Sequence, residues 1–210
     1  MESFFGICIA RMSSSINFMI HAMHALGVLY LDNPEIFQWR MPYYAERVHN
    51  KCGLTESVWG FIDDTLCKTC RPCYFQKLMY SGHKHCHGIK FQSIVTPDGL
   101  FASMYGPVNG KQHDSFLLST NGLLEKLQAF MPDLPGTVVF SLYGDPAYPQ
   151  SIYFLGGYKN PLNGSAHALW NTTMSKVHEV VEWGFTNILS QWSFWDFRAG
   201  MKIFQSPVDK

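Results

Sequence analysis

Two apolar segments of this chain each end on an aspartate. The segment SVWGFID covers residues 57–63 and ends at Asp63, and the segment TVVFSLYGD covers residues 137–145 and ends at Asp145. Both are short and rich in β-branched and aromatic residues, which is typical of strands buried in an α/β sheet. Such a sheet places its polar site where the strands end. We therefore expect Asp63 and Asp145 to terminate two buried strands and to face one cleft.

The region between the two segments predicts a hairpin followed by a helix. Residues 88–106 alternate in polarity on both sides of an Asp98-Gly99 turn, as two antiparallel strands do. Asp114 follows His113 and precedes an apolar stretch with helical spacing. Its carboxylate either caps the free N–H groups of that helix or supports a nearby site. The expected order is strand, strand, strand, helix, strand.

The last strong element is an amphipathic helix over residues 166–189. Its buried face consists of apolar residues at helical spacing, namely Val177, Val181, Gly184, Phe185 and Ile188. Around the helix axis Glu182 lies about 100° from Val181, at the edge of this face, whereas Glu179 lies at about 160° and points to solvent. We therefore expect Glu182, and not Glu179, to reach a cleft.

Length and composition indicate one α/β domain. The chain has 210 residues, of which 47% are hydrophobic, and its 16 Lys and Arg residues balance 16 Asp and Glu residues. This length allows a single sizeable core. We expect a short helical N-terminal segment at residues 1–56, with helices near residues 16–31 and 42–51, and an α/β domain at residues 57–210. We expect no membrane span and no secretory signal, because no apolar stretch is long enough and the N-terminus lacks a basic region.

A basic strip interrupts the balanced charge between residues 66 and 92. This stretch has no acidic residue and contains the cations Lys68, Arg71, Lys77, Lys84 and Lys90, with His83, His85 and His87 among them. Lysine and arginine at this density suit contacts with nucleic-acid phosphates, because binding releases counterions from the phosphate backbone. A solvated positive loop is the alternative interpretation.

The cysteines leave a metal site open as an alternative. Cys67, Cys70 and Cys73 are separated by two residues each, and four further soft ligands follow: His83, His85, Cys86 and His87. This set is sufficient for a structural zinc ion. Reduced thiols and surface histidines in a basic loop are the other interpretation, because a chain of this size can build its core without disulfides.

Five segments carry a family resemblance: WGFIDDT, CRP, YSGHKHCHGIKFQSIVTPDGLFASMYGPVNGKQHD, LYGDPAYP and VVEWGF. In this order they resemble the catalytic domain of PIF/Harbinger-type transposases, the DDE superfamily endonucleases, and the similarity covers about residues 57–197. The resemblance implies an α/β fold of the RNase H-like type, a mixed sheet flanked by helices. It also implies that Asp63, Asp145 and Glu182 are the catalytic and metal-binding residues, supported by Asp114 and His113.

The resemblance further implies a reaction and its partners. Enzymes of this kind cleave DNA phosphodiester bonds with two Mg²⁺ or Mn²⁺ ions, which need several converging carboxylate oxygens. DNA is then the substrate, and the expected DNA contacts in the basic strip are Lys68, Arg71, Lys84 and Lys90. A nuclear location and a separate DNA-binding partner protein are expected from the family alone, whereas the oligomeric state is left open. Relatives continue past the last residue of this chain, so we expect the domain to be truncated at its C-terminus.

Three positions depart from the pattern of the family. Asp64 occupies the position of a glycine after the first aspartate, His178 that of an arginine, and Thr186 that of a glycine. The extra carboxylate of Asp64 adds a like charge, which can raise the pKa of a neighbouring acid. These departures favour a second interpretation, a catalytically inactive domesticated DNA-binding or adaptor protein, or a decayed fragment of a mobile element.

Overall fold

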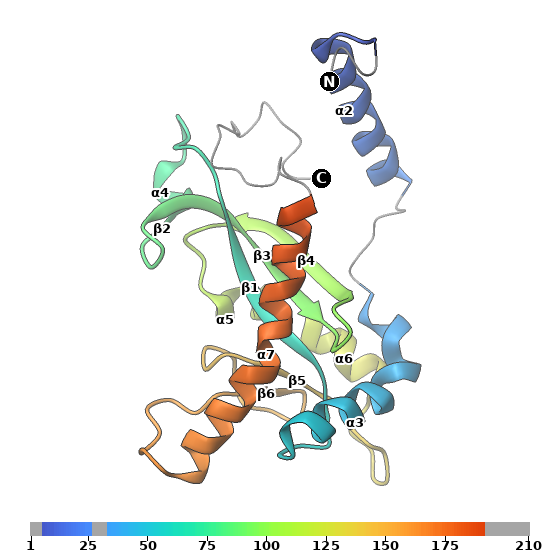
Figure 1. Ribbon diagram of the computed structural model, residues 1–210, viewed down its shortest axis with the longest axis vertical. Coiled ribbons are helices and arrows are strands. Elements are labelled where there is room, and N and C mark those ends of the chain that lie inside the picture. The colour runs from blue at the N-terminus through green and yellow to red at the C-terminus, as the bar shows by residue number, and fades with distance from the viewer. Residues whose placement is uncertain (1–5, 27–32, 192–210) are drawn as a thin grey trace.

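The computed structural model describes residues 6–26 and 33–191 of the chain (Figure 1). The helices are α2 (Ile9–Ala25), the 3₁₀ helix η1 (Pro34–Arg40), α3 (Met41–Cys52), α4 (Gln76–Met79), α5 (Asp114–Thr120), α6 (Leu123–Phe130) and α7 (Ala166–Gln191). The strands are β1 (Val58–Lys68), β2 (Tyr80–Ser81), β3 (Cys86–Val95), β4 (Phe101–Asn109), β5 (Ser141–Gly144) and β6 (Phe154–Gly156).

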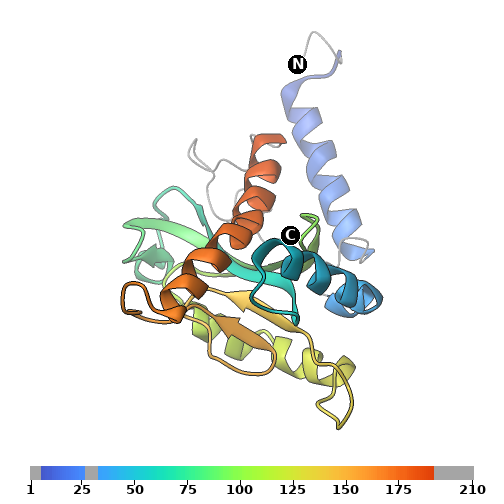
Figure 2. The same cartoon turned by 60° about the horizontal axis from the view of Figure 1, so that its bottom comes forward.

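The strands form one mixed sheet. Its order is β2-β3-β1-β5-β6, and β4 pairs with β3 beside this path. β1, β3 and β4 are antiparallel neighbours, whereas β5 and β6 run parallel to β1. The sheet curls, and α7 lies on one side of it while α5 and α6 lie on the other (Figures 1 and 2). The predicted α/β fold, a mixed sheet flanked by helices, is confirmed.

Two hydrophobic cores hold these helices against the sheet. The core under α7 contains Val58, Phe61, Val95, Tyr143, Met174, Val177 and Val181. The core under α6 contains Ile62, Ile94, Leu118, Leu123, Leu127 and Leu142. Neighbouring residues of one strand belong to different cores because side chains alternate between the two faces of a sheet. The sheet is therefore buried on both faces along β5 and along residues 58–62 of β1.

The N-terminal helices differ in how they pack. α3, predicted near residues 42–51, is confirmed and packs on β1 through the buried side chains of Tyr44, Ala45 and Val48. α2 buries no side chain and stands away from the sheet (Figure 1). The helix predicted near residues 16–31 corresponds to α2, which begins earlier, at Ile9. Residues 27–31 of that prediction lie outside the described part of the chain.

β1 extends further than the sequence predicts. It runs over Val58–Lys68, so that Asp63 lies in its middle, and the predicted strand end at Asp63 is wrong. The strand continues because its pairing with β3 continues, as far as Lys68 opposite Gly88. For β5 the predicted end is confirmed, since Asp145 directly follows the strand, although β5 begins only at Ser141.

The hairpin and the long helix follow the prediction, whereas the single helix predicted after Asp114 is divided into α5 and α6, and α4, β2 and β6 were not predicted. β3 and β4 form the expected hairpin, and Gly99 in its turn has a φ of 84°, a left-handed conformation that suits glycine. α7 covers the predicted helix, and its residues Val177, Val181 and Gly184 are buried as expected. None of the described helices combines the length and the apolar character needed to cross a membrane.

Candidate active site on the α7 face of the sheet

Asp63 and Asp64 are consecutive residues that point to opposite faces of the sheet. Side chains alternate along a strand, so residues two apart share a face. Phe61 lies in the core under α7, and Ile62 lies in the core under α6. Asp63 is therefore on the α7 face and Asp64 on the α6 face.

Asp145 lies on the same face as Asp63. β5 runs parallel to β1 with Phe61 paired to Tyr143; Asp63 is two residues beyond Phe61 in β1, and Asp145, two residues beyond Tyr143, directly follows the end of β5. Burial raises the pKa of Asp63, and the negative charge of Asp145 adds to this increase. The two carboxylates are thus close enough to repel each other, and a divalent cation between them would relieve that repulsion.

His178 is the α7 residue that faces Asp63. Its ring packs edge-on against Phe61 and Tyr143, with ring centroids 5.9 and 5.7 Å away. Its Nε2 lies 3.3 Å from the backbone oxygen of Ile62, and because a carbonyl oxygen only accepts, Nε2 donates in this contact. Burial raises the pKa of Asp63, and the charge of His178 opposes that increase. Sequence reasoning noted residue 178 only as a departure from the family.

Glu182 does not join the two aspartates in the structure. It follows His178 by one helical turn, so both side chains are on one side of α7. Its side chain is exposed, as is that of Glu179. Within residues 6–26 and 33–191, no group of three or more His, Cys, Asp and Glu side chains is arranged to hold a metal ion. Asp63 and Asp145 supply two hard oxygen donors of the kind that Mg²⁺ and Mn²⁺ prefer.

A hydrogen-bonded cluster surrounds Asp64 on the opposite face. Lys90 Nζ donates to Asp114 Oδ1 and lies 3.9 Å from Asp64 Oδ2. The Tyr148 hydroxyl donates to Asp64 Oδ1 at 2.9 Å and accepts from Gln92 Nε2 at 3.1 Å. The Asp64 side chain is only 5% exposed, and its Oδ2 has no hydrogen-bond partner among the described residues. Asp64 is therefore part of the interior and not of the cleft.

This environment makes Asp64 a weak acid. Burial, and then the nearby carboxylate of Asp114, raises the pKa of Asp64 to about 7. Burial works against ionisation of Asp114 too, but the hydrogen bonds with Lys90 and Asp64 and the positive charge of Lys90 together outweigh it and lower the pKa of Asp114. At neutral pH Asp114 is ionised beside Lys90, while Asp64 is partly protonated. Asp64, the second aspartate of β1, thus carries less than a full negative charge.

The turn after β5 links Asp145 to Tyr148, the residue that binds Asp64 on the α6 face of the sheet. Asp145 Oδ1 accepts a hydrogen bond from the backbone N–H of Ala147 at 2.8 Å, and the backbone N–H of Tyr148 donates to the carbonyl oxygen of Asp145 at 3.1 Å. This turn brings the Tyr148 ring against Gly144, where a Cβ would lie 2.6 Å from Tyr148 Cδ2. Gly144 therefore leaves the space that lets Tyr148 reach Asp64.

The other predicted site residues have different environments. Asp114 is the first residue of α5 and lies at the N-terminus of this helix, as predicted. Its carboxylate binds Lys90. His113, just before the helix, is exposed. The Lys90 side chain is only 14% exposed, so its charge is directed toward Asp114 and Asp64. The remaining cations predicted to contact DNA are exposed: Lys68, Arg71 and Lys84.

The cysteine-rich loop assembles no zinc site within the described part of the chain. All six cysteines are free thiols. Burial raises the pKa of Cys67 to about 11, and a thiol with that pKa is protonated at neutral pH, whereas zinc binds the thiolate. Both observations favour the interpretation of this loop as reduced thiols and histidines.

The fold and the position of the acids define a class of protein. Three antiparallel strands, two parallel strands beyond them and a long helix over the two aspartates form a nuclease domain of the RNase H-like type. Residues 62–206 match the DDE superfamily endonuclease family, and the chain belongs to this family. No curated protein and no solved structure matches the chain. Membership implies DNA as the substrate class.

The role of Gly144 predicts a stability effect. Gly144→Ala places a methyl group 2.6 Å from Tyr148 Cδ2 and 2.9 Å from Ile62 Cγ2, so the Tyr148 ring has to move. We expect the free energy of unfolding to fall by about 1–3 kcal/mol in urea titrations. Gly82→Ala is the matched control, because a Cβ there meets no atom within 4 Å. Equal unfolding midpoints for the two variants would contradict this account.

The environment of Asp64 predicts a pH effect. Its pKa is about 7 in the folded protein against 3.8 for the free side chain, so the folded state binds more protons between these values. The free energy of unfolding should therefore decrease as pH rises from 4 to 7. Asp64→Asn should flatten this decrease and be more stable than wild type at pH 8, by about 1–3 kcal/mol.

The measurement is chemical unfolding of both proteins at pH 5 and pH 8. Asp133→Asn is the control, since Asp133 is exposed and should leave the difference between the two pH values as it is in wild type. An Asp64→Asn protein with the wild-type difference would mean that Asp64 titrates normally.

Proposed function

We propose that this chain is a transposase-derived endonuclease of the PIF/Harbinger type that cleaves DNA phosphodiester bonds with two divalent metal ions. Asp63, Asp145 and Glu182 are the proposed ligands of Mg²⁺ or Mn²⁺. The observation that carries the proposal is the pair of Asp63, in β1, and Asp145, which directly follows the adjacent parallel strand β5 and whose negative charge raises the pKa of Asp63. Two such carboxylates suit hard cations.

The proposed reaction is an in-line hydrolysis. The oxygen of a water molecule attacks the phosphorus, the bond from phosphorus to the 3′-oxygen breaks, and the products are a 5′-phosphate and a 3′-hydroxyl that takes up one of the water protons. The same geometry allows a DNA 3′-hydroxyl to replace water. The bound ions would activate the attacking oxygen and stabilise the leaving oxygen. The protein's part is to hold carboxylates in fixed positions along β1 and β5.

His178 and Glu182 have complementary proposed roles on α7. His178 is already packed against Phe61 and Tyr143 beside Asp63, so it orients this end of the site. Glu182, one turn further and exposed, is the proposed third ligand. The Lys90–Asp114 pair on the other face is a proposed support that keeps β1 and β3 aligned behind Asp63.

The remaining proposals rest on the family resemblance and on the basic strip. DNA is the proposed partner, contacted by Lys68, Arg71 and Lys84, which are exposed. Lys90, predicted in the same set, is paired with Asp114 and nearly buried, and is not part of this proposed contact. A separate DNA-binding partner protein and a nuclear location are proposed from the resemblance alone.

A second candidate function is a catalytically inactive DNA-binding or adaptor protein. It is favoured by Glu182, whose exposed side chain does not join Asp63 and Asp145. Asp64 in place of the family's glycine and His178 in place of its arginine point the same way. Such a protein would bind DNA in a salt-dependent manner and would not cleave it.

Metal-dependent nicking of supercoiled DNA separates the two candidates. With Mn²⁺ we expect wild type to nick the plasmid and Asp63→Asn, Asp145→Asn and Glu182→Gln each to lower the rate by roughly 100-fold or more, because each removes a ligand of the ions that stabilise the transition state. Glu179→Gln is the matched control, an exposed glutamate three positions away on α7, and should cleave at the wild-type rate.

Two results would overturn the endonuclease proposal. The first is a wild-type nicking rate no higher than that of Asp145→Asn. If the wild-type protein then still binds DNA, with an affinity that falls as the salt concentration rises, the adaptor function is supported. The second is an equal effect of the substitutions at 179 and 182, which would remove Glu182 from the site.

A further inference from the structure

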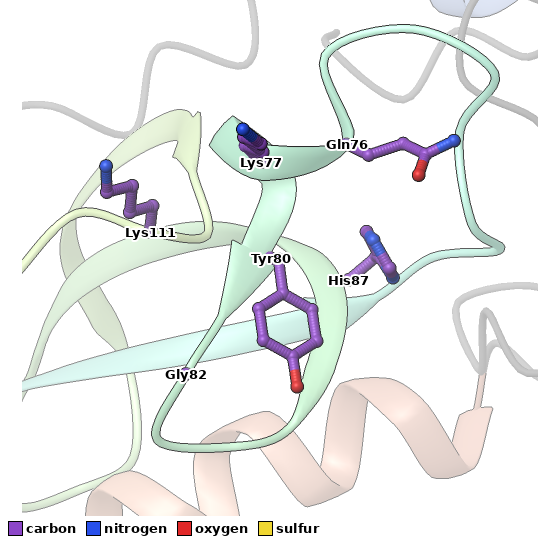
Figure 3. A pocket seen from close by; sticks show the side chains of 6 residues that line it. All are labelled: Gln76, Lys77, Tyr80, Gly82, His87 and Lys111. Carbon is purple, nitrogen blue, oxygen red and sulfur yellow. The ribbon is translucent and has the colours of Figure 1, made fainter.

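An open pocket lies at the far end of β3 from the turn of the β3–β4 hairpin. Its volume is about 430 Å³, and Gln76, Lys77, Tyr80, Gly82, His87 and Lys111 line it (Figure 3). The residues come from α4, β2, the start of β3 and the segment after β4. None of them belongs to the carboxylate site described above, so the pocket is a separate feature of the domain.

Close backbone packing builds this pocket. β2 pairs with β3 through Tyr80 opposite His87, and the segment after β4 crosses this hairpin at Gly110. A Cβ on Gly110 would lie 2.5 Å from the backbone oxygen of Gly88 and 2.7 Å from that of Met79, so only glycine permits the crossing. The backbone N–H of Lys111 then donates to the oxygen of Leu78 at 3.1 Å. This contact holds Lys111 beside α4.

The pocket carries positive charge and no acid. Lys77 and Lys111 are both exposed, and neither forms an ion pair with a described residue. Five of the six lining residues lie in the stretch from residue 66 to 92, which has no acidic side chain. Two lysines at a concave surface attract an anion, and the absence of a nearby carboxylate in the lining leaves them available to it.

An aromatic ring belongs to the same pocket lining. Tyr80 is 39% exposed, and its ring meets His87 edge-on at a centroid distance of 5.2 Å. Figure 3 shows the Tyr80 ring in the pocket between His87 and Gly82, with Lys77 and Lys111 on the other side of the view. Stacking surfaces next to cations are the features that bind single-stranded nucleic acid, because bases stack on the ring and lysines contact the phosphates.

We propose that this pocket binds one unpaired nucleotide of a DNA strand, its base on Tyr80 and its phosphates on Lys77 and Lys111. The choice of DNA rests on the proposed function. An acidic peptide would also satisfy the lysines, but it would leave the exposed ring of Tyr80 without a partner. A nucleotide uses both.

The sheet sets the distance between the pocket and the carboxylates. Gly88, next to His87, is paired with Lys68, five residues along β1 from Asp63. At about 3.3 Å per strand residue this is roughly 17 Å, or about five base steps of a DNA strand. A nucleotide in the pocket would therefore be about five positions along the strand from a phosphate at Asp63.

Fluorescence anisotropy of the full chain with a labelled 12-nucleotide oligothymidylate tests this proposal. The assay contains EDTA, so that binding is measured without cleavage. We expect Tyr80→Leu to weaken binding by roughly 5- to 100-fold, the effect of losing one stacked base, and Tyr80→Phe to bind within about twofold of wild type, because phenylalanine keeps the ring. On an abasic strand of the same length, Tyr80→Leu should bind as wild type does.

Charge substitutions test the phosphate contacts. Lys77→Gln and Lys111→Gln should each weaken binding of both strands and reduce the slope of log K against log salt by about 0.7. Lys51→Gln is the matched control, because Lys51 is an exposed lysine at the end of α3 and does not line the pocket. This variant should keep the wild-type affinity and the wild-type salt slope.

Two outcomes would overturn the proposal. One is a Tyr80→Leu protein that binds the oligothymidylate as wild type does or is equally weakened on the abasic strand, since the base would then make no contact. The other is competition by a glutamate peptide as strong as that by the oligonucleotide, which would assign the pocket to a protein partner. If binding depends on Tyr80 but the wild-type chain does not nick DNA, the proposed nucleotide pocket is supported and only the endonuclease proposal is overturned.

Discussion

The antiparallel pairing of β1 with β3 determines which carboxylates of this domain can act together. Because that pairing continues past Asp63 to Lys68, β1 stays extended and its side chains alternate strictly through both aspartates. Asp63 is directed to α7 and to Asp145, and Asp64 is directed to the α6 face. A register shifted by one residue would exchange them. It would bring the buried, partly protonated acid into the cleft and leave Asp145 without its partner.

The two faces treat negative charge in opposite ways. On the α6 face Asp114 is paired with Lys90, and Asp64 accepts a hydrogen bond from Tyr148 while its pKa rises to about 7. Charge on that face is neutralised within the protein. On the α7 face burial raises the pKa of Asp63, the charge of His178 opposes this increase, and the negative charge of Asp145 adds a smaller contribution to it. Among the described residues no lysine or arginine forms an ion pair with Asp63 or Asp145, and that difference is the physical reason to place cations on the α7 face.

Much of this arrangement could be predicted from the sequence, and the gaps have physical causes. The apolar runs, the Asp98-Gly99 turn and the helical spacing of α7 are local signals, and they predicted the sheet and the long helix. The strand end at Asp63 was predicted wrongly because pairing with β3 is a long-range contact. The sequence did not decide whether the Asp114 carboxylate caps a helix or supports the site, because its partner, Lys90, lies 24 residues away in the sequence. The role of Tyr148 depends on the space left by Gly144, which no pattern of polarity reports.

The position of bound metal is the most direct test of this account. Anomalous diffraction from crystals of the chain soaked in Mn²⁺ should show a peak about 2.0–2.3 Å from carboxylate oxygens of both Asp63 and Asp145, with a second ion about 3.5–4 Å from the first. A peak coordinated by Asp64 and Asp114, with none at Asp63 and Asp145, would contradict it, because the metal would then occupy the face that the protein already neutralises.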